Sequence, residues 1–227
     1  MTLAASLLPL ALLGAVAGLD VVSFPQAMFS RPLVSATLAG AFCGSAGSGL
    51  LAGVALELFA LETQPFGASR YPEWGSAGVV GGALFATHAD GHIGVLAFAV
   101  VAALCTAGVG GWSMVQHRHL IGRWTGAARD ALAAGSAAAV TGLQLRGLLS
   151  DFVRGGVVTA VAFAVFEPLA RLLPSALSGV PSSRAAVAVL AVATAGAAIW
   201  NLAHTVRGAS WLFAGGLAVG AVLVLAR

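Results

Sequence analysis

The sequence predicts an all-α, polytopic transmembrane protein with broken or re-entrant helices in its N-terminal third. Of the 227 residues, 59% are hydrophobic and only 8% are charged, and the mean hydropathy is +0.96. Soluble domains carry about 25% charged residues, so this chain has too few charges to cover a globular surface in water. Residues 93–115 and 208–226 contain no acidic, basic or histidine side chain, and about 20 such residues cross the hydrocarbon core of a bilayer as a helix.

The first apolar run, residues 3–19, is expected to be a membrane helix and not a cleaved signal peptide. A signal peptide has a basic segment ahead of its apolar core, but the first basic residue here is Arg31. A polar, broken segment with Asp20, Pro25 and Gln26 follows the run. Asp20 and Arg31 could pair with each other, flank a helix, or belong to a polar site.

Residues 32–56 form an uncharged run that is unusually rich in glycine, alanine and serine. Small residues let membrane helices approach closely, and they also suit short, interrupted helices that line a substrate cavity. Pro65, Gly67 and Pro72 then argue against a continuous helix, because proline removes a backbone donor and clashes with the preceding turn. We therefore expect broken helices here, an irregular segment over 64–73, and a short apolar helix over 74–87.

The second half is expected to hold longer helices. A polar turn at 88–92 precedes the run 93–115. The hydrophilic stretch 116–130 is expected to be a cytoplasmic loop, since loops rich in arginine usually lie inside, or an interfacial helix. A turn between Arg146 and Arg154 is expected to separate the next two apolar runs, and the remaining runs in order are 131–145, 155–173, 184–203 and 208–226. We expect one membrane domain over residues 1–227.

Ionisable side chains concentrate in the first third of the chain, which suggests a polar site built from residues 20–73. A charge at the centre of a bilayer costs about 2.5–3.5 kcal/mol, so such groups are functional candidates; the alternative is that they lie at helix ends on the membrane surface. Glu57 is the strongest candidate because residues 32–56 before it are uncharged. The full set is Asp20, Arg31, Glu57, Glu62, Arg70 and Glu73.

Other kinds of site have little support. His88 and His92 are four residues apart and could bind zinc on a helix, but the residues between them favour a turn and no third ligand is near, so a solvated loop is expected and no metal is. Cys43 and Cys105 are expected to be packing residues. The sequence has no nucleophile elbow, Walker loop or dinucleotide fingerprint, and no basic stripe that would indicate nucleic acid.

Short motifs in the first third follow one another in a definite order. Arg31-Pro-Leu comes first, then Gly44, then Glu57-Leu, then Gly67-Ala, and finally Pro72. Their order and spacing, over roughly residues 1–90, resemble the IIC membrane subunit of the mannose-family phosphotransferase system (PTS). Members of that family commonly read Arg-Pro-Leu, Gly-Asp, Thr-Gly, Glu-Leu or Glu-Met, Gly-Ala-Ala and Pro-Asp.

Gln26 corresponds to a polar residue ahead of the family's Arg-Pro pair. Two positions depart from the pattern: Ser45 and Glu73 stand where the family often has aspartate. By position, the resemblance implies a substrate-binding set of Gln26, Arg31, Glu57, Gly67 and Glu73. In this hypothesis Glu57 and Gln26 bind sugar hydroxyls and Arg31 orients a nearby carboxylate, because an unmade buried hydrogen bond costs about 1–3 kcal/mol.

The resemblance implies a sugar permease subunit in the inner (cytoplasmic) membrane of a bacterium. Such a subunit pairs with a IID membrane subunit, and we expect a homo-oligomer of IIC–IID pairs. The pair conducts a hexose-like sugar to a cytoplasmic IIB protein, which phosphorylates it with a phosphoryl group supplied by IIA. The IIC chain carries no phosphorylated residue, so no catalytic residue of its own and no cofactor are expected.

Three alternatives stay open. The chain could be a secondary transporter or channel that is not coupled to phosphotransfer, with Glu57 as a proton-coupling carboxylate. It could be a membrane-embedded enzyme with a metal at the His88–His92 turn. It could also be a IIC subunit of an incomplete system, retained for regulation.

Overall fold

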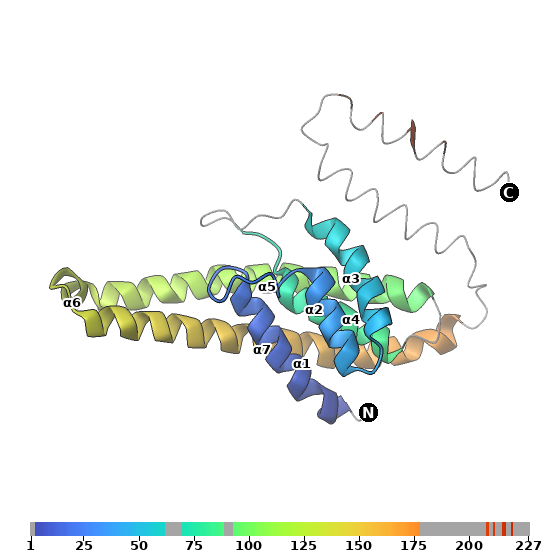
Figure 1. Cartoon of the computed structure of the whole chain (residues 1–227), viewed down its shortest axis with the longest axis horizontal. Coiled ribbons are helices and arrows are strands. Elements are labelled where there is room, and N and C mark those ends of the chain that lie inside the picture. The colour runs from blue at the N-terminus through green and yellow to red at the C-terminus, as the bar shows by residue number, and fades with distance from the viewer. Residues whose placement is uncertain are drawn as a thin grey trace.

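The computed structural model describes residues 3–61, 70–88 and 93–177, together with the single positions 208, 211, 215, 216 and 219. Every element in the three long segments is an α-helix (Figure 1). The prediction of an all-α membrane protein is therefore confirmed. In chain order the helices are α1 (Leu3–Asp20), α2 (Pro32–Phe42), α3 (Ala46–Ala60), α4 (Trp74–Thr87), α5 (Ile93–Ala127), α6 (Arg129–Ala133) and α7 (Ala137–Leu177).

The longest feature is a hairpin in which α5 and α7 run antiparallel and α6 forms the tip (Figure 1). Residues Gly94–Ala127 and Ala137–Leu172 are each long and apolar enough to cross a membrane. With 35 residues and a rise of 1.5 Å per residue, α5 is about 52 Å long, whereas the hydrocarbon core is about 30 Å thick. Part of the hairpin therefore lies beyond the hydrocarbon.

Helix α5 continues through most of the stretch 116–130, which the sequence predicts as a loop or a separate interfacial helix. That prediction is wrong, because α5 ends only at Ala127. His117, which lies in this stretch, has a partner on the facing helix: its Nε2 atom is 2.7 Å from the Oγ atom of Ser150. A polar side chain that finds its partner across the hairpin does not interrupt the helix that carries it.

Helix α7 runs through the turn predicted between Arg146 and Arg154, so that prediction is also wrong. Residues 137–167 contain no proline, and so no backbone donor is lost there. Arg154 donates through Nε to Oδ1 of Asp151 at 2.8 Å. Residues 137–145 of the first run and the whole of the second run, 155–173, are thus parts of one helix of 41 residues, whereas residues 131–136 lie in α6 and the turn before α7.

The N-terminal third contains short helices, as predicted, and α2 and α3 are separated by a tight break. Gly44 has a φ of +91°, a backbone conformation that glycine adopts without strain. Ser45 then caps α3, since its hydroxyl accepts a hydrogen bond from the amide of Ser48 at 3.4 Å. The two helices pack closely: a Cβ atom on Gly49 would lie 2.3 Å from the carbonyl oxygen of Ala36.

Helix α4 is the centre of the helical body, and its boundaries agree with the predicted helix over 74–87. Every residue from Trp74 to Phe85 is buried, and α4 contacts α1, α2, α3, α5 and α7. Small residues make this possible: a Cβ atom on Gly82 would lie 2.3 Å from the carbonyl oxygen of Ala36. Residues 70–73 before α4 are not helical, as expected for the irregular segment.

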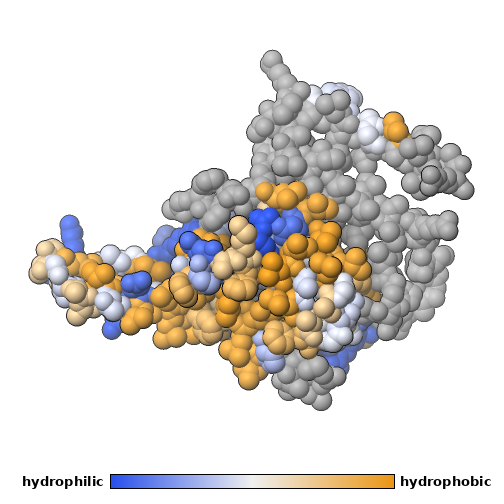
Figure 2. All heavy atoms as spheres, in the orientation of Figure 1, coloured by the Kyte–Doolittle hydropathy of each residue, from blue (hydrophilic) through white to orange (hydrophobic). Residues whose placement is uncertain are grey.

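The surface is strongly apolar over the broad body of the molecule, and hydrophilic side chains are interspersed along the narrow end formed by the hairpin (Figure 2). Helix α7 exposes a row of apolar side chains at four-residue spacing. Exposed apolar surface of this extent indicates lipid or membrane partners. The row comprises Leu145, Leu149, Val153, Val157, Val161, Val165 and Leu169. The apolar runs predicted over 184–203 and 208–226 lie outside the described residues, apart from the single positions named above.

The close approach of α2 and α3 gives a first prediction. Replacing Gly49 by alanine should destabilise the protein by about 1–3 kcal/mol, because the added methyl group collides with backbone atoms that cannot move independently. Gly47 lies on the same helix with open space around it, so Gly47→Ala is the matched control and should be neutral or stabilising. Thermal unfolding of the purified proteins in detergent measures both. Equal melting temperatures for the two variants would contradict the packing described here.

Candidate functional site

A buried carboxylate at the end of α1 organises the loop formed by residues 21–31. Asp20 is 2% exposed. Its Oδ1 atom accepts a hydrogen bond from the amide of Ala27 at 2.6 Å, and its Oδ2 atom accepts from both the amide and the hydroxyl of Ser30 at 2.9 Å. The loop is therefore tied back to the end of α1. Asp20 does not pair with Arg31, which was one of the arrangements that the sequence left open.

Arg31 and Glu57, both predicted site residues, form an ion pair between the residue that precedes α2 and the last turn of α3. The second oxygen of Glu57 accepts a hydrogen bond from the amide of Leu33 at 3.1 Å, at a helix N-terminus where negative charge is favoured. The side chains of Arg31 and Glu57 are 35% and 18% exposed. The pair is thus held in place by α2 but stays accessible to a ligand.

Gln26 lies on the same loop as Arg31, and its side chain is exposed. Its backbone has a φ of +58°, in the left-handed region that few non-glycine residues adopt. Among the described residues, its amide nitrogen donates to the carbonyl of Val22 at 3.1 Å and not to Arg31 or Glu57. The structure therefore places Gln26 on the loop that carries Arg31 without joining it to the ion pair.

Glu73 lies apart from the ion pair, at the start of α4, and is fully buried. Its carboxylate accepts from the amide of Ser76 at 3.1 and 3.3 Å, and its own amide donates to Ala107 of α5 at 3.0 Å. A Cβ atom on Gly110 would lie 2.7 Å from the Glu73 side chain, so α5 presses closely on this cap. In this position Glu73 fixes where α4 begins. Gly67 lies outside the described residues.

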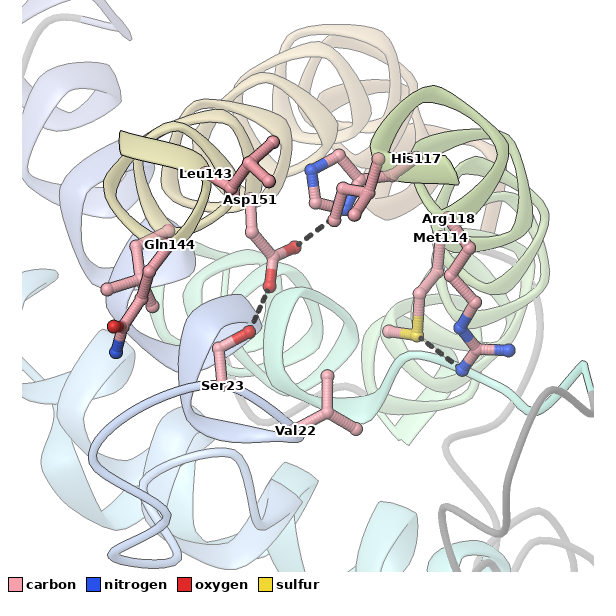
Figure 3. Close-up of a pocket in the computed structure, with 11 residues that line it drawn as sticks. Val22, Ser23, Met114, His117, Arg118, Leu143, Gln144 and Asp151 are labelled. Atoms are coloured by element: carbon pink, nitrogen blue, oxygen red, sulfur yellow. Dashed lines mark hydrogen bonds and ion pairs between the residues drawn. The ribbon is translucent and has the colours of Figure 1, made fainter. Parts of the chain in front are cut away.

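A polar cavity of about 440 Å³ lies between the start of the loop, α5 and α7 (Figure 3). Its apolar walls come from side chains such as Met114, Ile121, Leu143 and Leu148. Its polar lining consists of Ser23, His117, Arg118, Gln144 and Asp151.

Asp151 is the centre of the polar lining and is only 3% exposed. Ser23 donates to its Oδ2 atom at 2.9 Å, and Arg154 donates to its Oδ1 atom at 2.8 Å. Arg154 also donates to Ser113 of α5 at 3.2 Å. The Nδ1 atom of His117 lies 3.8 Å from Oδ1 of Asp151. These contacts join α5 and α7 to the loop and fix the carboxylate beside the cavity.

The side chains that line the cavity are not among the site residues predicted from the sequence. Helix α7 also buries further charged side chains. Glu167 is 2% exposed, bonds to Arg171, and lies 3.6 Å from His88. Buried charged side chains therefore also occur outside residues 20–73, the range in which the sequence predicts the polar site. The sequence contains a signal that could have indicated these buried charges. Within apolar runs, an acidic and a basic residue stand three or four positions apart, as in Asp151 with Arg154 and Glu167 with Arg171. Residues at this spacing share one face of a helix.

The described residues contain no group of three or more histidine, cysteine, aspartate or glutamate side chains that could hold a metal ion. His88 ends α4, and His92, its companion in the zinc alternative, lies outside the described residues. Cys43 is half-buried and Cys105 is exposed, and both are free thiols.

The anchoring of the loop gives a second prediction. Asp20→Ala removes three hydrogen bonds to a buried carboxylate, and hydrogen bonds to charged groups contribute about 1.5–3 kcal/mol each. Hydrogen exchange at the amides of Ala27 and Ser30 should then be about 10- to 100-fold faster, because local opening of the loop becomes cheaper. Asp130→Ala, at the exposed tip of the hairpin, is the control and should leave exchange in the loop unchanged. Unaltered exchange in Asp20→Ala would show that the loop is held by other contacts.

A comparison with known protein families matches residues 4–200 to the family described as the sorbose-specific IIC component of the PTS. No curated protein and no solved structure matches the chain. The matched span contains nearly all of α1 and the whole of the other six helices, the Arg31–Glu57 pair and the polar cavity. This family match also agrees with the resemblance seen in the motifs of the first third. The chain therefore belongs to the sorbose-specific IIC components, a family of membrane subunits within the mannose-family PTS.

Proposed function

We propose that this chain is the membrane-spanning IIC subunit of a mannose-type permease, and that it binds and translocates a hexose-like sugar for phosphorylation by a cytoplasmic IIB partner. Family membership makes the chain a membrane component of a PTS permease. The observation that carries the finer proposal is the accessible Arg31–Glu57 pair at the end of an ordered loop.

The chemistry of the pair suits a sugar. Sugar hydroxyl groups both donate and accept hydrogen bonds, so a carboxylate beside a guanidinium offers both kinds of partner. Glu57 is already oriented by the amide of Leu33, and hydrogen bonds to charged groups contribute about 1.5–3 kcal/mol each. Gln26, on the same loop, supplies an amide that can reach a ligand from the exposed side.

Gly67 and Glu73 belong to the proposed substrate-binding set on the strength of the family pattern alone. Glu73 is buried as the cap of α4, so it would contact sugar only after the start of α4 has moved. Its contacts support a simpler role, in which it fixes the start of α4 against α5. We therefore expect changes at Glu73 to act on folding more strongly than on sugar affinity.

The proposed partners fit the surfaces of the molecule. The apolar row on α7 would face lipid or the IID subunit, and homo-oligomers of IIC–IID pairs would cover more of the same surface. Residues 116–149 at the hairpin tip contain four arginines and one aspartate. The tip would therefore lie on the cytoplasmic side of a bacterial inner membrane, where the IIB and IIA proteins act.

Replacing Glu57 tests the sugar site. Glu57→Gln should lower sorbose uptake and sorbose phosphorylation by about 10- to 100-fold in cells that supply IIA, IIB and IID, because a charge-assisted hydrogen bond is lost. Thr37→Val is the control: this hydroxyl donates only within α2, to Leu33, and the variant should behave as wild type at equal expression. Wild-type activity in Glu57→Gln would remove this residue from the site.

The same cells separate phosphotransfer from the main alternative. If sorbose accumulates only as its phosphate and uptake requires IIA and IIB, the chain works as a PTS permease. If uptake continues without these proteins and stops when a protonophore dissipates the proton gradient, the secondary-transporter alternative with Glu57 as the proton carrier is correct. Co-purification with the IID protein tests the proposed membrane complex.

A further inference from the structure

The polar cavity lies where the apolar part of the hairpin ends. Residues 93–115 of α5 are uncharged and span about 35 Å as a helix, which matches a hydrocarbon core of about 30 Å. Met114, His117 and Ile121, which line the cavity, follow one another across the end of this run. Asp151 of α7 lies at the same level, because its neighbour Ser150 bonds to His117.

The side of the membrane follows from the charges beyond the cavity. The hairpin continues from the cavity toward the tip that carries the four arginines. Segments enriched in arginine usually lie on the cytoplasmic side. The cavity is therefore at the cytoplasmic boundary of the membrane, where a sugar leaves the protein and becomes accessible to a soluble enzyme.

The lining of the cavity suits a neutral polyol. A carboxylate has about four acceptor positions, and among the described residues Ser23 and Arg154 occupy two of those on Asp151. Ser23 and His117 offer polar atoms, and Met114 and Leu148 offer apolar surface for the C–H groups of a sugar ring. Arg154 balances the charge of Asp151, and Arg118 is a further charged side chain of the lining. Cavities of 300–1,000 Å³ are typical of small-ligand sites, and about 440 Å³ is within that range.

One ordered loop joins this cavity to the Arg31–Glu57 pair. Ser23 near the start of the loop bonds to Asp151, Arg31 at its end pairs with Glu57, and Asp20 holds the loop between them. The two polar sites are therefore close along the chain and share one structural support. A sugar released from the first site has a second set of hydrogen-bond partners before it reaches the cytoplasm.

We propose that the cavity between Ser23, His117 and Asp151 is a second sugar-binding site, in which the unphosphorylated hexose is held at the cytoplasmic exit before phosphorylation. This inference rests on the proposed function and adds a site to it. The Arg31–Glu57 pair takes the sugar from the far side, and the exit site presents it to the phosphorylating partner.

Site-specific labelling tests the exit site without depending on transport. In a background in which Cys43 and Cys105 are replaced by alanine, Gln144→Cys places a thiol in the cavity wall for reaction with a maleimide in membrane vesicles that contain the full chain and its IID partner. Sorbose at tenfold its dissociation constant should slow labelling about tenfold, because the reagent reacts only with the empty fraction. Arg146→Cys, on the same helix but outside the cavity lining, is the matched control and should label at the same rate with and without sorbose.

Two further labelling measurements test whether the cavity binds the free sugar or an anion. Ser23→Ala, added to Gln144→Cys, should weaken the protection by sorbose, because Asp151 loses the hydroxyl that orients it. A hexose phosphate should protect no better than the free sugar, because the exit site holds the sugar before phosphorylation. Stronger protection by the phosphate would make the cavity an anion site and overturn the proposal.

Failure of the exit site and failure of the proposed function give different results. If wild-type protein takes up and phosphorylates sorbose, or mannose when sorbose is not a substrate, while the same sugar leaves Gln144→Cys labelling unchanged, the exit site is wrong and the permease function stands. If the complete system phosphorylates neither sugar and neither protects Gln144→Cys, both proposals fall. Protection at Gln144→Cys together with loss of uptake in Glu57→Gln supports two separate sites.

Discussion

The loop over residues 21–31 and the two polar sites that it connects depend on one buried carboxylate, that of Asp20 at the end of α1. Burial of a charge is costly unless hydrogen bonds replace water, and Asp20 obtains three of them from Ala27 and Ser30 in the following loop. The loop in turn carries Ser23 to the cavity and Arg31 to Glu57. Both proposed sugar sites therefore take their geometry from the same anchor.

The sequence could predict α2, α3 and α4 because proline, glycine or a capping side chain stands at their ends. Pro32 starts α2, Gly44 and Ser45 separate α2 from α3, and Glu73 caps α4. The continuous helices α5 and α7 could not be predicted in the same way, because charge was taken as the sign of a loop. Polar residues such as His117 and Arg154 stay inside a helix when partners on neighbouring elements satisfy them.

In the candidate site too, local sequence patterns could predict some features, and contacts between distant elements determine the others. Arg31 and Glu57 are in short motifs within the first third, and the sequence indicated that Arg31 lies near a carboxylate; the structure shows that this carboxylate is Glu57. The contact of Ser23 with Asp151 joins residues that are 128 positions apart. Such a contact depends on how α1 packs against α7, and no local pattern in a single sequence contains that information. The sequence therefore indicated the residues of the Arg31–Glu57 pair and gave no sign of the cavity.

The unbroken course of α5 and α7 past the end of the hydrocarbon has a mechanical consequence. A continuous helix has no hinge at the water boundary, so the hairpin responds to the bilayer as a rigid lever. A hydrophobic stretch longer than the local hydrocarbon thickness accommodates the mismatch by tilting. A change of tilt within the lipid then moves the arginine-rich tip farther than it moves the part of the hairpin inside the lipid. The height of that tip above the membrane is thereby linked to bilayer thickness.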